Sequence, residues 1–124
     1  MLFAFMGILS WNAQAELILV SGKSKQKNYI DTSNVSVSFN PKVVTYDQLI
    51  FIGKNDPLNS WRNSVIVKTL KMNCDKKNWF MISEIRKSWD RSTVIEKLPN
   101  DTNPVVHPVI DSGPVKFVYD KYCR

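Results

Sequence analysis

The chain has 124 residues, with 17 basic and 11 acidic side chains and a formal net charge of +6 at pH 7. This length is typical of one domain with its own core, and a hydrophobic content of 44% excludes a disordered chain. The positive balance favours anionic partners such as acidic proteins or anionic surfaces. We expect no specific nucleic-acid recognition.

The first element is an apolar run at residues 2–11, followed by the small-x-small pattern Ala13-Gln14-Ala15. This combination is typical of a secretory signal peptide, and the run is shorter than the roughly 20 residues of a membrane-spanning helix. No Lys or Arg precedes it, and a buried N-terminal strand or helix is the alternative. We expect a signal peptide at 1–15, no transmembrane segment, and an exported domain at 16–124 that is periplasmic, secreted or associated with the cell surface.

The next segments indicate β structure. Residues 16–21 and 29–31 are rich enough in apolar side chains to form short strands, and the polar residues 22–28 between them predict a hairpin loop. Asn40-Pro41 predicts a turn that ends the preceding extended segment. After it, β-branched and aromatic side chains over 43–52 predict a long strand.

The clearest strand pattern ends at a cysteine. From Ile66 the even positions carry mostly apolar side chains as far as Cys74, and this near period-2 alternation predicts one buried face with Cys74 pointing inward. Residues 75–78 are a polar turn, and the aromatic and branched residues of 79–89 predict the returning strand of a hairpin.

The C-terminal part predicts a last strand at 93–98, an irregular proline-rich crossing at 99–111 and a helix. Ser112 or Gly113 can cap this helix, and Pro114 suits its first turn. Its apolar stripe falls at i, i+3, i+4 and i+7, on Val115, Val118, Tyr119 and Tyr122. Nine or ten residues are too few for a stable isolated helix, so we expect it to dock on the sheet.

The two cysteines complete the fold hypothesis. In an exported protein they favour a disulfide over a metal site, so we expect a Cys74–Cys123 bond that ties the helix to the sheet. The predicted class is α+β, with an antiparallel meander of about six strands and one C-terminal helix packed on it.

Catalytic patterns are weak. His107 is the only histidine, and a catalytic role would require it to act with a lone carboxylate such as Asp111. The four glycines form no phosphate-binding loop, and the aspartates show no acid and base pairing. We therefore expect no enzyme activity, no cofactor and no metal, with an enzyme built around His107 as the remaining alternative.

The basic residues are the better candidates for function. Those that we expect to form a binding surface are Lys23, Lys25, Lys27, Lys76, Lys77, Arg86 and Lys87. Exposed tryptophans among them, Trp79 or Trp89, would add stacking or cation–π contacts to a polyanion or an acidic protein. The alternative is that the tryptophans lie in the core and the lysines form only a solvated surface.

Several segments resemble the surface-adhesin protein E-like family of Gram-negative bacteria. They are the export signal, the Tyr29-Ile30-Asp31-Thr32-Ser33-Asn34-Val35 element, the strand ending Met72-Asn73-Cys74, and Ser112-Gly113 opening a helix that ends at Cys123. The resemblance covers nearly all of 16–124. It implies a curved antiparallel sheet with a C-terminal helix packed on it, and an adhesin that binds host matrix or plasma proteins such as vitronectin, laminin and plasminogen.

Two functional hypotheses follow from charge and resemblance together. The first is an exported, non-enzymatic, adhesin-like binding protein that engages host proteins or an anionic surface through its basic residues. The second is a small periplasmic cell-envelope protein with no host ligand, motivated by the lack of a lipid-accepting cysteine near Ala15. A homodimer is an open alternative in both.

Overall fold

The computed structural model describes residues 16–23, 26–53, 63–100 and 103–124. The signal-peptide prediction for residues 1–15 lies outside them, as does Lys25. None of the helices in the described ranges is long and apolar enough to cross a membrane.

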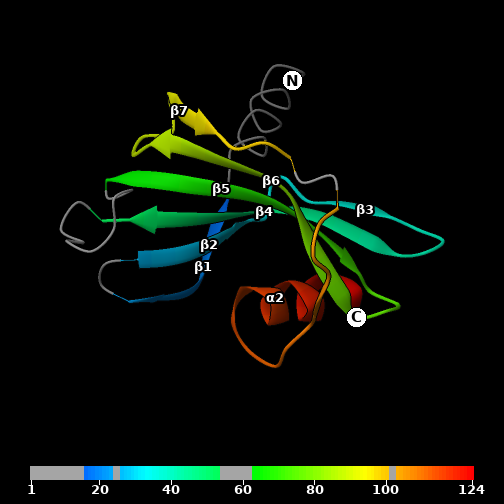
Figure 1. The fold of residues 1–124 in the computed structure, drawn as a ribbon. Coiled ribbons are helices and arrows are strands. Elements are labelled where there is room, and N and C mark those ends of the chain that lie inside the picture. Colours follow the sequence, from blue (N-terminus) through cyan, green and yellow to red (C-terminus); the bar gives the residue numbers. More distant parts are fainter. Residues whose placement is uncertain (1–15, 24–25, 54–62, 101–102) are drawn as a thin grey trace, which may run out of the picture.

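The described residues form a mostly antiparallel β-sheet with one short C-terminal helical segment (Figure 1). The strand order is β1-β2-β4-β5-β6-β7, with β3 paired to β4 and β8 paired to β6. The strands are β1 (Leu17–Lys23), β2 (Gln26–Asp31), β3 (Ser36–Ser38), β4 (Val43–Ile52), β5 (Ser64–Asn73), β6 (Asn78–Ser88), β7 (Val94–Lys97) and β8 (His107–Pro108).

The described ranges contain eight strands where about six were predicted. β3 and β8 hold only three and two residues, too few for a composition signal, and they form by pairing with longer neighbours. The hairpin predicted around residues 22–28 is confirmed, but the bounds of its loop are wrong, because β1 continues to Lys23 and β2 starts at Gln26. Backbone pairing therefore extends through polar residues that the composition assigned to a loop.

β5 is the central strand of the meander. All ten of its residues pair with β4 on one side and with β6 on the other. Thr69 pairs with Ser83 while Leu70 pairs with Met81, so Ile82 is an extra residue in β6, a β-bulge. Side chains of β6 before and after Ile82 consequently follow opposite alternations.

The helical segment starts as predicted. α2 (Gly113–Val118) has Ser112 at its N-cap, and a π-helical turn η1 (Tyr119–Cys123) follows it. Gly113 has a φ of 78°, in the left-handed region that favours glycine. α2 lies against one face of the sheet, near the end where β5 and β6 are joined (Figure 1).

The core confirms the predicted stripe and the inward direction of Cys74. Val115 and Val118 are buried, and Tyr119 and Tyr122 pack against the same cluster. The buried residues of this cluster are Ile30, Val44, Tyr46, Leu70, Met72, Cys74, Val115 and Val118. The helix therefore packs on the part of the sheet face around Met72, while Ile52 and Ile66 of the same face are buried outside this cluster.

The disulfide joins Cys74 to Cys123, as predicted, and its two Cα atoms lie 5.3 Å apart. The Cys123 sulfur is also 3.6 Å from the Met72 sulfur. Because a disulfide sulfur carries no proton to donate, this is a packing contact. The bond fixes the last turn of the chain beside the end of β5.

Replacing both Cys74 and Cys123 by Ala should lower the free energy of unfolding by about 4 kcal/mol, because the bond closes a loop with a sequence separation of 49. Urea unfolding of the wild type and the double variant measures the difference. A reducing agent should destabilise the wild type and leave the variant unchanged. Two free thiols in mass spectra of non-reduced protein would contradict the pairing.

Candidate functional site

The two faces of the sheet carry different side chains, and α2 covers only one of them. Directly paired residues of antiparallel strands share a face, so Val44, Met72 and Trp79 lie together on the face that α2 covers. We call the opposite face the outer face. On it lies a continuous cross-strand row in which Lys27 pairs with Phe51, Phe51 with Val65, and Val65 with Lys87.

Three aromatic side chains cross this end of the outer face, and we call Tyr29, Phe51 and Trp89 the aromatic row. Their rings meet edge to face, with centroids 5.2 Å apart between Tyr29 and Phe51 and 5.4 Å apart between Phe51 and Trp89. Trp89 remains 47% exposed. The guanidinium of Arg91 lies 5.9 Å from the centroid of the Phe51 ring, within cation–π range.

The aromatic row thus sits between three cations. Lys27 on β2 and Lys87 on β6 lie at the two ends of the cross-strand row that contains Phe51, and Arg91 comes from the turn after β6. Lys27 and Arg91 are exposed, and Lys87 is half-buried. Trp, Tyr and Arg are the residue types enriched in protein-binding hot spots, and the two lysines add positive charge that attracts an anionic partner.

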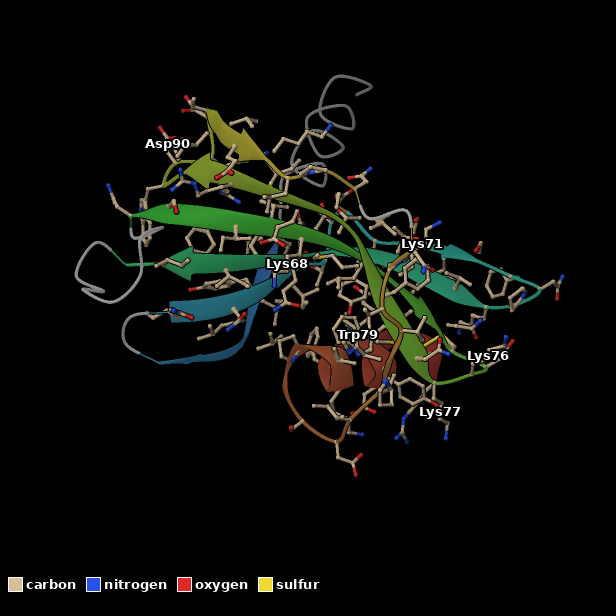
Figure 2. The ribbon with its side chains drawn as sticks, viewed as in Figure 1. Lys68, Lys71, Lys76, Lys77, Trp79 and Asp90 are labelled. Carbon is tan, nitrogen blue, oxygen red and sulfur yellow. A yellow bond between two sulfur atoms is a disulfide. The ribbon has the colours of Figure 1, made fainter. Side chains whose placement is uncertain are left out.

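A single carboxylate organises the turn that presents Trp89 and Arg91 (Figure 2). Asp90 Oδ1 accepts hydrogen bonds from the Ser88 hydroxyl at 2.7 Å, the Ser92 hydroxyl at 2.7 Å and the Ser92 backbone N–H at 3.0 Å. These bonds, led by the one from the Ser92 backbone, lower the pKa of Asp90 to about 2. The ionised carboxylate therefore holds the turn in shape at neutral pH.

The structure does not bring all seven predicted basic residues together. Lys27 and Lys87 share the row described above, whereas Arg86 lies on the opposite face, where its Nε is 3.8 Å from a carboxylate oxygen of Glu96. The backbone of Lys23 ends β1, and nothing is described of its side chain.

Lys76 and Lys77 occupy the β5–β6 turn at the far end of the sheet (Figure 2). The ammonium group of Lys77 lies 5.9 Å from the centroid of the Tyr119 ring, on the helical segment. From Val65 to Asn73, β5 extends roughly 26 Å at about 3.3 Å per residue. This distance separates the turn from the aromatic row, so the predicted surface divides into two.

The two tryptophans named from the sequence have different environments. Trp89 is exposed in the aromatic row, whereas Trp79 packs against the core beside α2. His107 stacks on Trp79, with ring centroids 4.6 Å apart and an interplanar angle of 27°. Across the described ranges, no group of three His, Cys, Asp or Glu side chains could hold a metal ion.

Sequence reasoning missed Tyr29, Phe51 and Arg91 as parts of the site. Phe51 and Lys27 are 24 positions apart, and only the β2–β4 register brings them into one row. Residues 49–52 are apolar throughout, so no alternation in the sequence separates Phe51 on the outer face from the buried Ile52. Arg91 has a φ of 65° in the turn after β6, a conformation that the sequence does not indicate for arginine.

No protein-family model matches the chain, and neither a curated protein nor a solved structure has significant similarity to it.

Replacing Asp90 by Asn should destabilise the protein near neutral pH and have little effect in strong acid. The folded pKa of Asp90, about 2, lies below its ordinary value of 3.8, so its stabilising effect is present above about pH 4 and is lost as the pH falls through about 2. Melting temperatures of both proteins from pH 6 to pH 2 measure this. A constant difference over that range would contradict it, and Asp75→Asn, in another exposed turn, is the control.

Proposed function

We propose that this protein is an exported, non-catalytic binding protein, adhesin-like in its mode of action, and that the aromatic row with its three cations contacts an acidic region of a partner protein. The observation that carries this proposal is the arrangement of Lys27, Lys87 and Arg91 around partly exposed aromatic rings on the outer face. The disulfide supports an oxidising compartment, since such bonds persist mainly in exported proteins.

The physical basis for binding has two parts. Exposed cations attract an acidic surface and raise the association rate, but each contributes little to holding the complex because water and salt screen it. The aromatic row supplies apolar area that loses little side-chain entropy on binding. An acidic segment with apolar side chains between its carboxylates would satisfy both, with carboxylates at the three cations and apolar groups on Trp89 and Phe51.

The identity of the partner rests on the resemblance to the protein E-like family. Membership in that family stays a proposal, and through it vitronectin, laminin and plasminogen are the first partners to test. The net charge of +6 is compatible with acidic partners of this kind.

Reversing charge at Lys27 and Lys87 to Glu should weaken binding to these host proteins, mainly through a slower association rate. Wild-type affinity should also fall as salt rises from about 0.05 M to about 0.5 M, because the screening length shortens over that range. Surface plasmon resonance measures both effects.

The matched control is Lys77→Glu with Lys121→Glu, which makes the same change in net charge beside the helical segment. This control variant should bind almost as well as the wild type. Equal losses in the two double variants would show that net charge alone is responsible. Binding that responds neither to salt nor to the Lys27 and Lys87 reversals would contradict the proposed surface.

Cell fractionation separates the adhesin-like function from that of a periplasmic cell-envelope protein. We expect protease added to intact cells to degrade the protein, or the medium to contain it, because a host partner must be able to reach it. A periplasmic protein of known location is the control for leakage. Protein found only in the periplasm would overturn the adhesin-like function and favour the cell-envelope alternative.

A further inference from the structure

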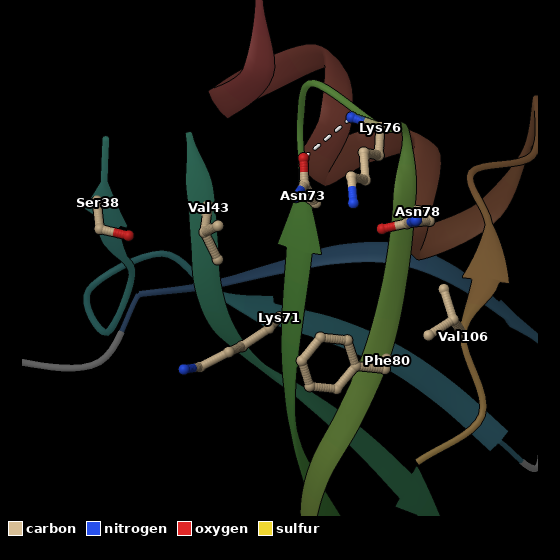
Figure 3. Close-up of a pocket in the computed structure, with 8 residues that line it drawn as sticks. All are labelled: Ser38, Val43, Lys71, Asn73, Lys76, Asn78, Phe80 and Val106. Atoms are coloured by element: carbon tan, nitrogen blue, oxygen red, sulfur yellow. Dashed lines mark hydrogen bonds between the residues drawn. The ribbon is translucent and has the colours of Figure 1, made fainter. Parts of the chain in front are cut away.

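The far end of the outer face holds an open pocket of about 390 Å³ (Figure 3). Two adjacent cross-strand rows form its floor. In the first row Ser38 pairs with Val43, Val43 with Asn73, and Asn73 with Asn78. In the second, Lys71 pairs with Phe80.

Two further segments border the pocket. Lys76 lies above the floor in the β5–β6 turn, and Val106 stands beside Phe80 on the segment leading to β8 (Figure 3). Strands β3 to β6 and the segment before β8 all contribute. The helical segment lies behind the strands in this view, so the pocket opens away from α2.

The polar lining consists of hydrogen-bond donors and cations. Lys71 and Lys76 supply two ammonium groups, and Asn73, Asn78 and Ser38 supply amide and hydroxyl groups. The Asn73 side-chain oxygen accepts a hydrogen bond from the Lys76 backbone N–H at 3.0 Å, which leaves its NH₂ group as a donor. None of the lining residues is acidic.

The apolar lining is a platform rather than a closed cavity. The Phe80 ring presents its face to the open side of the pocket, with Val106 beside it (Figure 3). An aromatic face suits the C–H face of a pyranose ring, while side-chain amides and hydroxyls can pair with sugar hydroxyls. The two lysines add a preference for a negative charge on the same ligand.

We propose that this pocket binds one carboxylated pyranose unit, a uronic or sialic acid residue of a glycan. The pyranose ring stacks on Phe80, its carboxylate lies near Lys71 and Lys76, and Asn73 and Asn78 pair with its hydroxyl groups. A volume of about 390 Å³ accommodates one such unit together with water. The pocket is separate from the aromatic row, and the failure of either proposal leaves the other intact.

The test is a titration of the whole protein with four small molecules. Binding is monitored by the NMR chemical shifts of the Asn73 and Asn78 side-chain amides. Glucuronate and N-acetylneuraminate carry both ring and carboxylate, glucose carries the ring alone, and acetate carries the carboxylate alone. At least one of the two sugar acids should bind about tenfold tighter than glucose and acetate. Which one binds tighter identifies the source of the ligand.

Substitutions then assign the contacts. Lys71→Gln with Lys76→Gln should weaken sugar-acid binding about tenfold, and Phe80→Leu should remove the advantage of the sugar acids over acetate. The control Lys97→Gln with Lys121→Gln removes the same charge at two exposed residues outside the pocket lining and should leave binding unchanged. Circular dichroism verifies that each variant is folded.

Three results would overturn the proposal. The first is that neither sugar acid binds more tightly than acetate or glucose. The second is that the Lys71 and Lys76 variant keeps the wild-type affinity for the sugar acids, and the third is that the control variant loses as much of that affinity as the Lys71 and Lys76 variant.

Discussion

The docking of the C-terminal helical segment on half of one sheet face determines which surfaces of this protein stay available. β4 and β5 each have 10 residues and extend about 33 Å. α2 and η1, with six and five residues, together extend only about 16 Å. Val115 and Val118 can therefore bury only the half of the face around Met72, and the disulfide keeps the segment at that position.

The outer face accordingly has two separate ends. Lys71 in the pocket lies six residues along β5 from Val65, whose row holds Lys27 and Lys87. This separation is roughly 20 Å, more than twice the screening length of about 8 Å at physiological salt. Between them the Asp47 carboxylate accepts hydrogen bonds from Asn34 and Thr69, both at 2.7 Å. The cations at one end consequently have little electrostatic effect on a ligand at the other, and the two ends can recognise different chemical groups.

Local pattern predicted the central strands and the helix, because alternation and capping residues depend on near neighbours in the sequence. The disulfide could be predicted although its cysteines are 49 positions apart, because the chain has only two cysteines. Local pattern could not predict β3 and β8, which exist only through pairing. It also grouped Arg86 with Lys87, since adjacency in the sequence says nothing about which face a bulged strand presents. The pocket was missed for the same reason, because Ser38, Phe80 and Val106 come together only through strand register.

The bulge at Ile82 sets the phase of β6. Residues up to Met81 alternate in one phase and place Trp79 toward the core, whereas those after Ile82 alternate in the other and place Lys87 beside Val65. A one-residue insertion or deletion near Ile82 would shift that phase and exchange the side chains of Arg86 and Lys87 between faces. In this stretch of β6 the number of residues, more than their chemistry, determines which side chains lie on the outer face.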